Sequence, residues 1–256
     1  MFDEPFAEGA SFIHRLDPRA RLLSALAGAV CFAVLQSLAA AGAALTLALA
    51  LLFLSAPPWG LVLRRLALVN VFILFMWLTV PLTMPGEALW HWGPLSASRE
   101  GLALMLLISI KCNAIIMLLL TLLASMHFAA LGAALEQLRC PPKLVFLFLF
   151  AYRYAHVAVA EWRTLHDAAR LRGFAPRTSM HCYRTIGYLL GMTFVRGFDR
   201  SRRVYEAMLL RGFAGHFQSL ESFRASTRDL LFSALLLASL GLIAGCDFYF
   251  GGPVHV

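Results

Sequence analysis

Residues 22–63 form a run of 42 residues without a single Asp, Glu, Lys or Arg. One crossing of the hydrocarbon layer needs about 20 predominantly apolar residues, so this run is long enough for two helices. We expect a helical hairpin that turns near residues 36–42 and ends before Pro57 and Pro58. Helices are expected because lipid offers no partner for the free backbone groups of an open sheet.

Three further runs have the same character. Residues 66–86 are uncharged and are predicted to be stopped by Pro81 and Pro85, and residues 101–125 are interrupted only by Lys111. Residues 230–246 are bounded by Asp229 and Asp247. Only 14% of the chain is charged, against about 25% in a typical soluble domain. The sequence therefore predicts an all-α integral membrane protein with about five transmembrane helices.

The basic residues near the ends of these runs predict the orientation, because Lys and Arg favour the cytoplasmic side. Arg15, Arg19 and Arg21 precede the first run, whereas the loop 85–100 holds only Arg99. The N-terminus is therefore expected in the cytoplasm. Asp17 is expected to cap the first helix, with Pro18 as its first residue; a plain helix start is the alternative.

The long segment 124–228 is basic. It holds 15 of the 22 Lys and Arg residues but only six acidic residues. Its apolar stretches, 144–160 and 185–195, are predicted to be helices at or below the membrane surface, since Arg153 in mid-bilayer would cost a few kcal/mol. Hidden additional spans and contact with anionic lipid are alternative interpretations. The predicted parts are a cytoplasmic segment 1–21, transmembrane helices at 22–125, cytoplasmic helices with two Leu-Arg-Gly-Phe motifs at 126–228, and the last transmembrane helix with the C-terminus at 229–256.

A 13-residue pattern occurs twice in this basic segment, 39 positions apart. Residues 163–175 read RTLHDAARLRGFA and residues 202–214 read RRVYEAMLLRGFA, with seven of 13 positions identical. Arg163 with Asp167, and Arg202 with Glu206, have the i,i+4 spacing of helical ion pairs. Gly173 and Gly212 suit the left-handed position that ends a helix. Each copy is therefore predicted to be the last turns of a helix.

These two helix ends have two interpretations. They are ordinary helix stops, or each presents an arginine, Arg172 or Arg211, whose planar guanidinium suits carboxylates in a groove. Two matching ends suit a partner with two similar grooves. A third Arg-Gly-Phe, at residues 196–198, lacks the preceding pattern and is interpreted as coincidence or a loop.

The sequence lacks the motifs of several common kinds of catalytic and binding site. Neither lysine, Lys111 nor Lys143, ends a phosphate-binding loop. No catalytic, cofactor-binding or metal-binding residues are predicted; the adjacent His181 and Cys182 are a weak candidate for a metal site, since neighbours on a helix point apart. No nucleic acid is expected as a partner. Lys111 lies deep in a predicted span, where an ionisable group indicates either function, such as contact with another membrane subunit, or a structural contact with a neighbouring helix.

The chain resembles the transmembrane (T) component of energy-coupling factor transporters. Three features carry the resemblance: residues 14–21, reading HRLDPRAR, before the first span; a helical membrane part followed by a long basic part; and the paired Arg-Gly motifs. The family motif often reads Ala-Arg-Gly, whereas Leu171 and Leu210 hold the first position here. The length and the opening segment are most similar to the cobalt-type subgroup, with nickel transporters close by.

The resemblance implies a coupling subunit in the cell (inner) membrane. Its partners would be two ATP-binding-cassette ATPases that use ATP and Mg, a substrate-capture membrane subunit, a small accessory membrane subunit in some systems, and the lipid bilayer. The role of docking the ATPases would fall to Leu171, Arg172, Gly173, Leu210, Arg211 and Gly212.

Under this interpretation the chain is not itself an enzyme, binds no cofactor and couples ATP hydrolysis to import of cobalt for cobalamin biosynthesis. A nickel or vitamin transporter of the same type is the alternative. A membrane-embedded enzyme or a stand-alone carrier is the alternative from another class.

Overall fold

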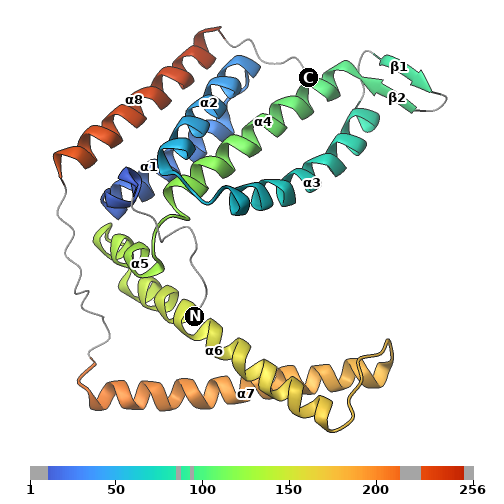
Figure 1. Cartoon of the computed structure of the whole chain (residues 1–256), viewed down its shortest axis with the longest axis vertical. Coiled ribbons are helices and arrows are strands. Elements are labelled where there is room, and N and C mark those ends of the chain that lie inside the picture. The colour runs from blue at the N-terminus through green and yellow to red at the C-terminus, as the bar shows by residue number, and fades with distance from the viewer. Residues whose placement is uncertain (1–10, 85–87, 93–94, 214–225, 251–256) are drawn as a thin grey trace. The chain divides into compact units, whose positions relative to one another are not determined.

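The computed structural model describes residues 11–84, 88–92, 95–213 and 226–250. The described chain is helical apart from one hairpin, β1 (Ala88–Trp92) and β2 (Leu95–Ser98), which pair antiparallel (Figure 1). It forms two compact units, one of residues 4–134 and 223–256 and one of 1–3 and 135–222. The all-α fold class predicted from the sequence is confirmed.

The first unit, which we call the membrane unit, is built around one long helix. α4 (Arg99–Leu122) packs against α1 (Pro18–Val34), α2 (Leu38–Ser55) and α3 (Trp59–Thr83), and α8 (Thr227–Phe250) packs on α1 and α2 (Figure 1). The short helices η1 (Phe12–Arg15) and α5 (Phe128–Gln137) complete its helical part, although α5 continues into the second unit.

Small residues let these helices approach closely, as expected for helices that pack in lipid. A Cβ atom on Gly28 of α1 would lie 2.5 Å from Leu118 of α4, so glycine permits the close contact of these two helices. Gly42 has nothing within 4 Å of such a Cβ and does not serve in this way. The buried small face of α2 consists of other residues, Ala40, Ala41, Ala44 and Ala48.

The helix boundaries refine the sequence predictions. Asp17 caps α1 as predicted, since its carboxylate accepts a hydrogen bond from the amide of Arg19, and Pro18 is the first helical residue. The turn between α1 and α2 lies at residues 35–37, at the early edge of the predicted range. α3 continues through Pro81 to Thr83, so the prediction that Pro81 stops it was wrong; a proline near a helix end removes few backbone bonds.

Five helices within the described residues are long and apolar enough to cross a membrane, namely α2, α3, α4, α6 and α8. The number of candidate spans agrees with the prediction, but their identity differs: α6 is among them, whereas α1, which was predicted to span, is not. α1 has 17 residues, which is about 25 Å of helix and the lower limit for a span. α6 was expected to lie at or below the surface.

The second unit consists of two long helices. α6 (Pro142–Leu171) and α7 (Met180–Leu210) pack against each other where they cross (Figure 1). The two apolar stretches predicted as separate helices are thus parts of these longer helices. The third Arg-Gly-Phe lies inside α7, so its interpretation as a loop was wrong.

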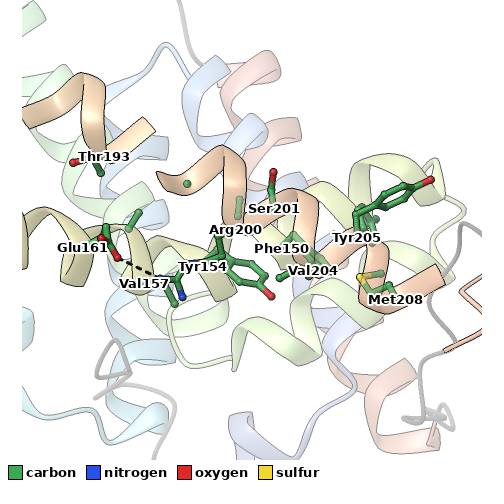
Figure 2. Close-up of a pocket in the computed structure, with 14 residues that line it drawn as sticks. Phe150, Tyr154, Val157, Glu161, Thr193, Arg200, Ser201, Val204, Tyr205 and Met208 are labelled. Atoms are coloured by element: carbon green, nitrogen blue, oxygen red, sulfur yellow. Dashed lines mark hydrogen bonds and ion pairs between the residues drawn. The ribbon is translucent and has the colours of Figure 1, made fainter. Parts of the chain in front are cut away.

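An ion-pair cluster and a cavity mark this crossing. Glu161 of α6 accepts hydrogen bonds from Arg196, at 2.5 Å, and Arg200, at 3.3 Å, both of α7. A cavity of about 450 Å³ lies between the helices and is lined mostly by apolar side chains. Figure 2 shows Glu161 and Arg200 paired in its wall.

Candidate functional site: two capped helix ends

The two copies of the repeated pattern form the same structure at the ends of α6 and α7. Gly173 and Gly212 are left-handed, with φ of +86° and +80°. The amide of Phe174 donates to the carbonyl of Ala169, and the amide of Phe213 donates to that of Met208, each at 3.0 Å. The glycine amides donate to Arg170 and Leu209, also at 3.0 Å. This paired arrangement is the Schellman motif, so the predicted helix ends and the predicted glycine conformation are confirmed.

The phenylalanine after each glycine anchors its helix end. Phe213 stacks on Phe146 near the start of α6, with ring centroids 5.5 Å apart. Phe174 contacts His166 edge-on at 6.4 Å. After the first end, Cys182 is buried and its sulfur accepts the amide of Arg177, which folds the connecting loop back onto α7. The helix ends are therefore held by contacts outside the motif itself.

The side chains of the two motifs face outward. Leu171 is 91% exposed and Leu210 is 90% exposed, although a leucine at a helix end can usually fold back onto its helix. Arg172 and Arg211 are exposed as well, at the C-cap of each helix. Within the described residues neither guanidinium forms a hydrogen bond or ion pair. Each end thus presents an apolar group and an exposed cation on a fixed backbone.

One of the two predicted ion pairs behind these ends is present. Arg202 binds Glu206 at 3.1 Å. In the described part of the chain Arg163 does not pair with Asp167, which instead lies 3.9 Å from a ring nitrogen of His166. Exposed i,i+4 pairs contribute only a few tenths of a kcal/mol, so either arrangement is compatible with the helix.

Lys111 lies in the membrane unit and contacts a neighbouring helix. Its ammonium group donates to the carbonyl of Ala33 at 3.1 Å. That carbonyl lies in the last turn of α1, where backbone oxygens lack helical partners and carry the negative end of the helix dipole. The geometry agrees with the structural interpretation of Lys111, and the predicted contact with another membrane subunit stays a prediction.

Two aspartates near the ends of α8 form contacts that the sequence did not predict; in the sequence they only mark the limits of the apolar run 230–246. Asp229 accepts the amides of Asp17 at 2.9 Å and Ser226 at 2.8 Å, and Asp247 accepts those of Gln36 and Ser37, both at 2.8 Å. Each carboxylate therefore ties α8 to the start of α1 or α2. The Ser226-x-x-Asp229 spacing of a capping box could have revealed the first of them.

Arg21 in the HRLDPRAR segment forms a buried contact, in addition to indicating the orientation of the chain in the membrane. It is 2% exposed and donates to the hydroxyl of Ser125, which in turn donates to the carbonyl of Thr121. The sequence offered no signal for this contact, because Arg21 and Ser125 are 104 positions apart.

Fold and site together define a helical multi-pass membrane protein whose second unit has two exposed, matching helix ends. The family model described as "CbiQ: Cobalt transport protein" matches residues 9–221. The chain is 28% identical over 221 residues to the energy-coupling factor transporter transmembrane protein EcfT of Acidaminococcus fermentans, covering 81% of each chain. It is 33% identical over 104 residues to the nickel permease LarQ of Lactiplantibacillus plantarum, covering 41% of this chain and 37% of the relative.

The chain belongs to the CbiQ family of cobalt transport proteins and is the transmembrane component of an energy-coupling factor transporter. Such a component works with other transporter subunits.

Proposed function

We propose that the chain couples ATP hydrolysis by two ATP-binding-cassette subunits to the movement of a separate substrate-capture membrane subunit. Arg172 and Arg211 dock into one groove on each ATPase, and α6 and α7 transmit the movement of the ATPases to the rest of the chain. ATP and Mg are used by the ATPases, and this chain supplies no catalytic residue.

The observation that carries the proposal is the identity of the two helix ends. Ordinary helix stops need the glycine and its two backbone bonds, but they do not need an exposed leucine and an exposed arginine in the same two positions. A free guanidinium on a fixed backbone loses little entropy when it forms a bidentate contact with a carboxylate.

The proposal requires both ends to lie in the cytoplasm, where ATP is available. α6 is long and apolar enough to span, but a spanning α6 would carry both Arg172 and Arg211 to the opposite face. α6 also contains Lys143, Arg153 and Glu161, which are costly inside hydrocarbon. We therefore assign α6 and α7 to the cytoplasmic surface of the cell (inner) membrane, with the N-terminus on the same side.

We propose cobalt, for cobalamin biosynthesis, as the substrate. The matching family model describes cobalt transport proteins, and the partial relative LarQ, a nickel permease, makes nickel the alternative. Metal selection would lie in the capture subunit, joined in some systems by a small accessory membrane subunit. The family membership gives no support to a membrane-embedded enzyme or a stand-alone carrier.

The docking role is tested by co-purifying the ATPases with Arg172→Ala, Arg211→Ala and the double variant. Arg184→Ala is the matched control, because Arg184 is an exposed arginine elsewhere on α7 that forms no ion pair with any residue the structure describes. Truncating one member of a docked charge pair costs about 2–5 kcal/mol, so each single variant should retain the ATPases weakly and the double variant should lose them. Full assembly and uptake in the double variant would contradict the proposal.

The substrate is tested by uptake of radioactive cobalt and nickel into cells that express the whole transporter. Cobalt uptake that requires this chain and its ATPases is expected. Uptake of nickel alone would replace cobalt with nickel and leave the docking role unchanged.

A further inference from the structure

The third Arg-Gly-Phe, at residues 196–198, lies at the cavity between α6 and α7 and has no part in the proposed docking. Gly197 lines the cavity, and Arg196 binds Glu161, which also lines it. Phe198 is 70% exposed and lies outside the lining. This tripeptide, which lacks the pattern that precedes the two helix ends, therefore helps to form the wall of a cavity.

The cavity is elongated, and its two ends differ in chemistry. Its α6 wall runs from Phe146 to Glu161, which is about 22 Å of helix at 1.5 Å per residue. Figure 2 shows Glu161 and Thr193 at one end and Met208 at the other. At the apolar end the rings of Phe146 and Phe150 stack, with centroids 4.4 Å apart. The volume of about 450 Å³ lies within the range of small-ligand sites, about 300–1,000 Å³.

Small residues keep this space open. Ala151 and Ala158 of α6 and Gly197 of α7 line the cavity. A Cβ atom built on Gly197 would meet nothing within 4 Å, unlike one built on Gly28, where two helices pack closely. Because protein interiors are normally packed without voids of this size, the cavity suits an occupant other than the two helices that form it.

The charged end of the cavity has a surplus of positive charge. Glu161 accepts hydrogen bonds from Arg196 and Arg200, so two guanidinium groups face one carboxylate. A guanidinium has five N–H donors, and each of these two donates one of them to Glu161. Both arginine side chains are 44% exposed, so their other donors are accessible to a second anion.

An amphiphile with an anionic head matches both ends. The apolar wall suits a hydrocarbon chain, and it is longer than one leaflet of the hydrocarbon layer, which is about 15 Å thick. The surplus guanidinium donors suit a phosphate group with a net negative charge. The position assigned above to α6 and α7, at the cytoplasmic membrane surface, places the cavity beside lipids of this kind.

We propose that the cavity between α6 and α7 is a binding site for an anionic phospholipid, with one acyl chain along the apolar wall and the phosphate on Arg196 and Arg200. The inference rests on the assignment of the two helices to the membrane surface under the proposed function, but not on the docking of Arg172 and Arg211. The bound lipid packs against both helices and so stabilises their crossing.

The test uses the full chain purified in detergent and two lipids with identical acyl chains, phosphatidylglycerol and phosphatidylcholine. Native mass spectrometry measures how much of each lipid the chain retains. Phosphatidylglycerol is anionic, whereas the choline group of phosphatidylcholine cancels the charge of its phosphate. The wild-type chain should therefore retain about five times more phosphatidylglycerol than phosphatidylcholine, the effect of one basic residue near an anionic lipid.

Two variants separate the two parts of the site. Arg200→Gln removes the surplus charge, while Glu161 keeps its bond to Arg196. Retention of phosphatidylglycerol should then fall about fivefold, to the level of phosphatidylcholine. Gly197→Leu places an apolar side chain in the cavity without a clash at its Cβ atom, so the variant should retain neither lipid.

The matched controls are Arg203→Gln and Gly191→Leu. Arg203 and Gly191 are the same residue types on the same helix but lie outside the lining of the cavity. Both controls should retain phosphatidylglycerol as the wild type does. Thermal unfolding in detergent checks that all four variants fold.

Equal retention of the two lipids by the wild type, or unchanged retention of phosphatidylglycerol in both cavity variants, would overturn this inference. So would a Gly197→Leu chain that keeps its lipid but loses the capture subunit, because the cavity would then accommodate a protein. Co-purification of the ATPases should be unchanged in all four variants. A wild-type chain that retains the lipid but binds no ATPase would contradict the proposed function alone, so the two failures are distinguishable.

Discussion

The left-handed glycine at the end of α7 gives the sharpest quantitative prediction. Gly212 has φ of +80°, and a Cβ atom built on it would meet nothing within 4 Å. Gly212→Ala therefore causes no clash with a neighbour. Its whole effect is the cost of holding an L-residue in the left-handed conformation, about 1–2 kcal/mol.

The chain has one other response to this substitution, which is to open the motif. Opening breaks the bonds from Gly212 to Leu209 and from Phe213 to Met208 and removes Phe213 from Phe146. Two backbone hydrogen bonds contribute about 0.5–1.5 kcal/mol each. The two responses are of similar cost, so we expect the closed helix end to be destabilised by about 1–2 kcal/mol.

Hydrogen–deuterium exchange at the amide of Phe213 measures this change directly, because that amide exchanges when the motif opens. A loss of 1–2 kcal/mol corresponds to exchange about 5–30 times faster. Gly212→Asn should accelerate exchange less, since Asn tolerates the left-handed conformation better than Ala. Binding of the ATPases should weaken more in Gly212→Ala than in Gly212→Asn. The loss of affinity should not exceed the factor by which the population of closed helix ends falls.

Gly191→Ala is the matched control. Gly191 lies inside α7, has no positive φ, and also has nothing within 4 Å of an added Cβ. Alanine favours a helix interior by up to about 1 kcal/mol, so exchange at Phe213 should not accelerate. Equal exchange rates for the two alanine variants, or faster exchange with Asn than with Ala, would refute the reasoning.

Two further predictions concern the membrane unit. Gly28→Ala places a Cβ 2.5 Å from the side chain of Leu118, which must shift, so the thermal midpoint in detergent should fall; Gly42→Ala, with nothing within 4 Å, should leave it unchanged. Asp247→Ala leaves two backbone amides at the start of α2 without their acceptor and should destabilise the unit by about 1–3 kcal/mol in denaturation measurements. The control is Asp199→Ala, because Asp199 is an exposed aspartate on α7, and it should leave the free energy of unfolding unchanged. An equal loss of stability in both variants would show that the two amides do not depend on Asp247.

Much of this architecture was predictable because local sequence decides it. Uncharged runs of sufficient length can only be buried in lipid or protein, which predicted the helices of the membrane unit. The repeated Leu-Arg-Gly-Phe fixed both helix ends, since a glycine after a run of strong helix formers and a following apolar residue are sufficient for a Schellman motif. The cap at Asp17 is equally local.

Contacts between distant residues required the tertiary structure. Asp247 accepts hydrogen bonds at the start of α2, and Arg21 donates one to Ser125; both contacts join positions more than 100 residues apart. The sequence shows that these residues are charged but not which partners they have. The small face of α2 could not be chosen among its many alanines, because nearly every position of that helix is small or apolar. The exposure of Leu171 and Leu210 was likewise undecided, since a leucine at a helix end packs or projects according to what lies beside it. Sequence determined where each helix ends, whereas only the packing of the chain decided which side chains those ends leave free.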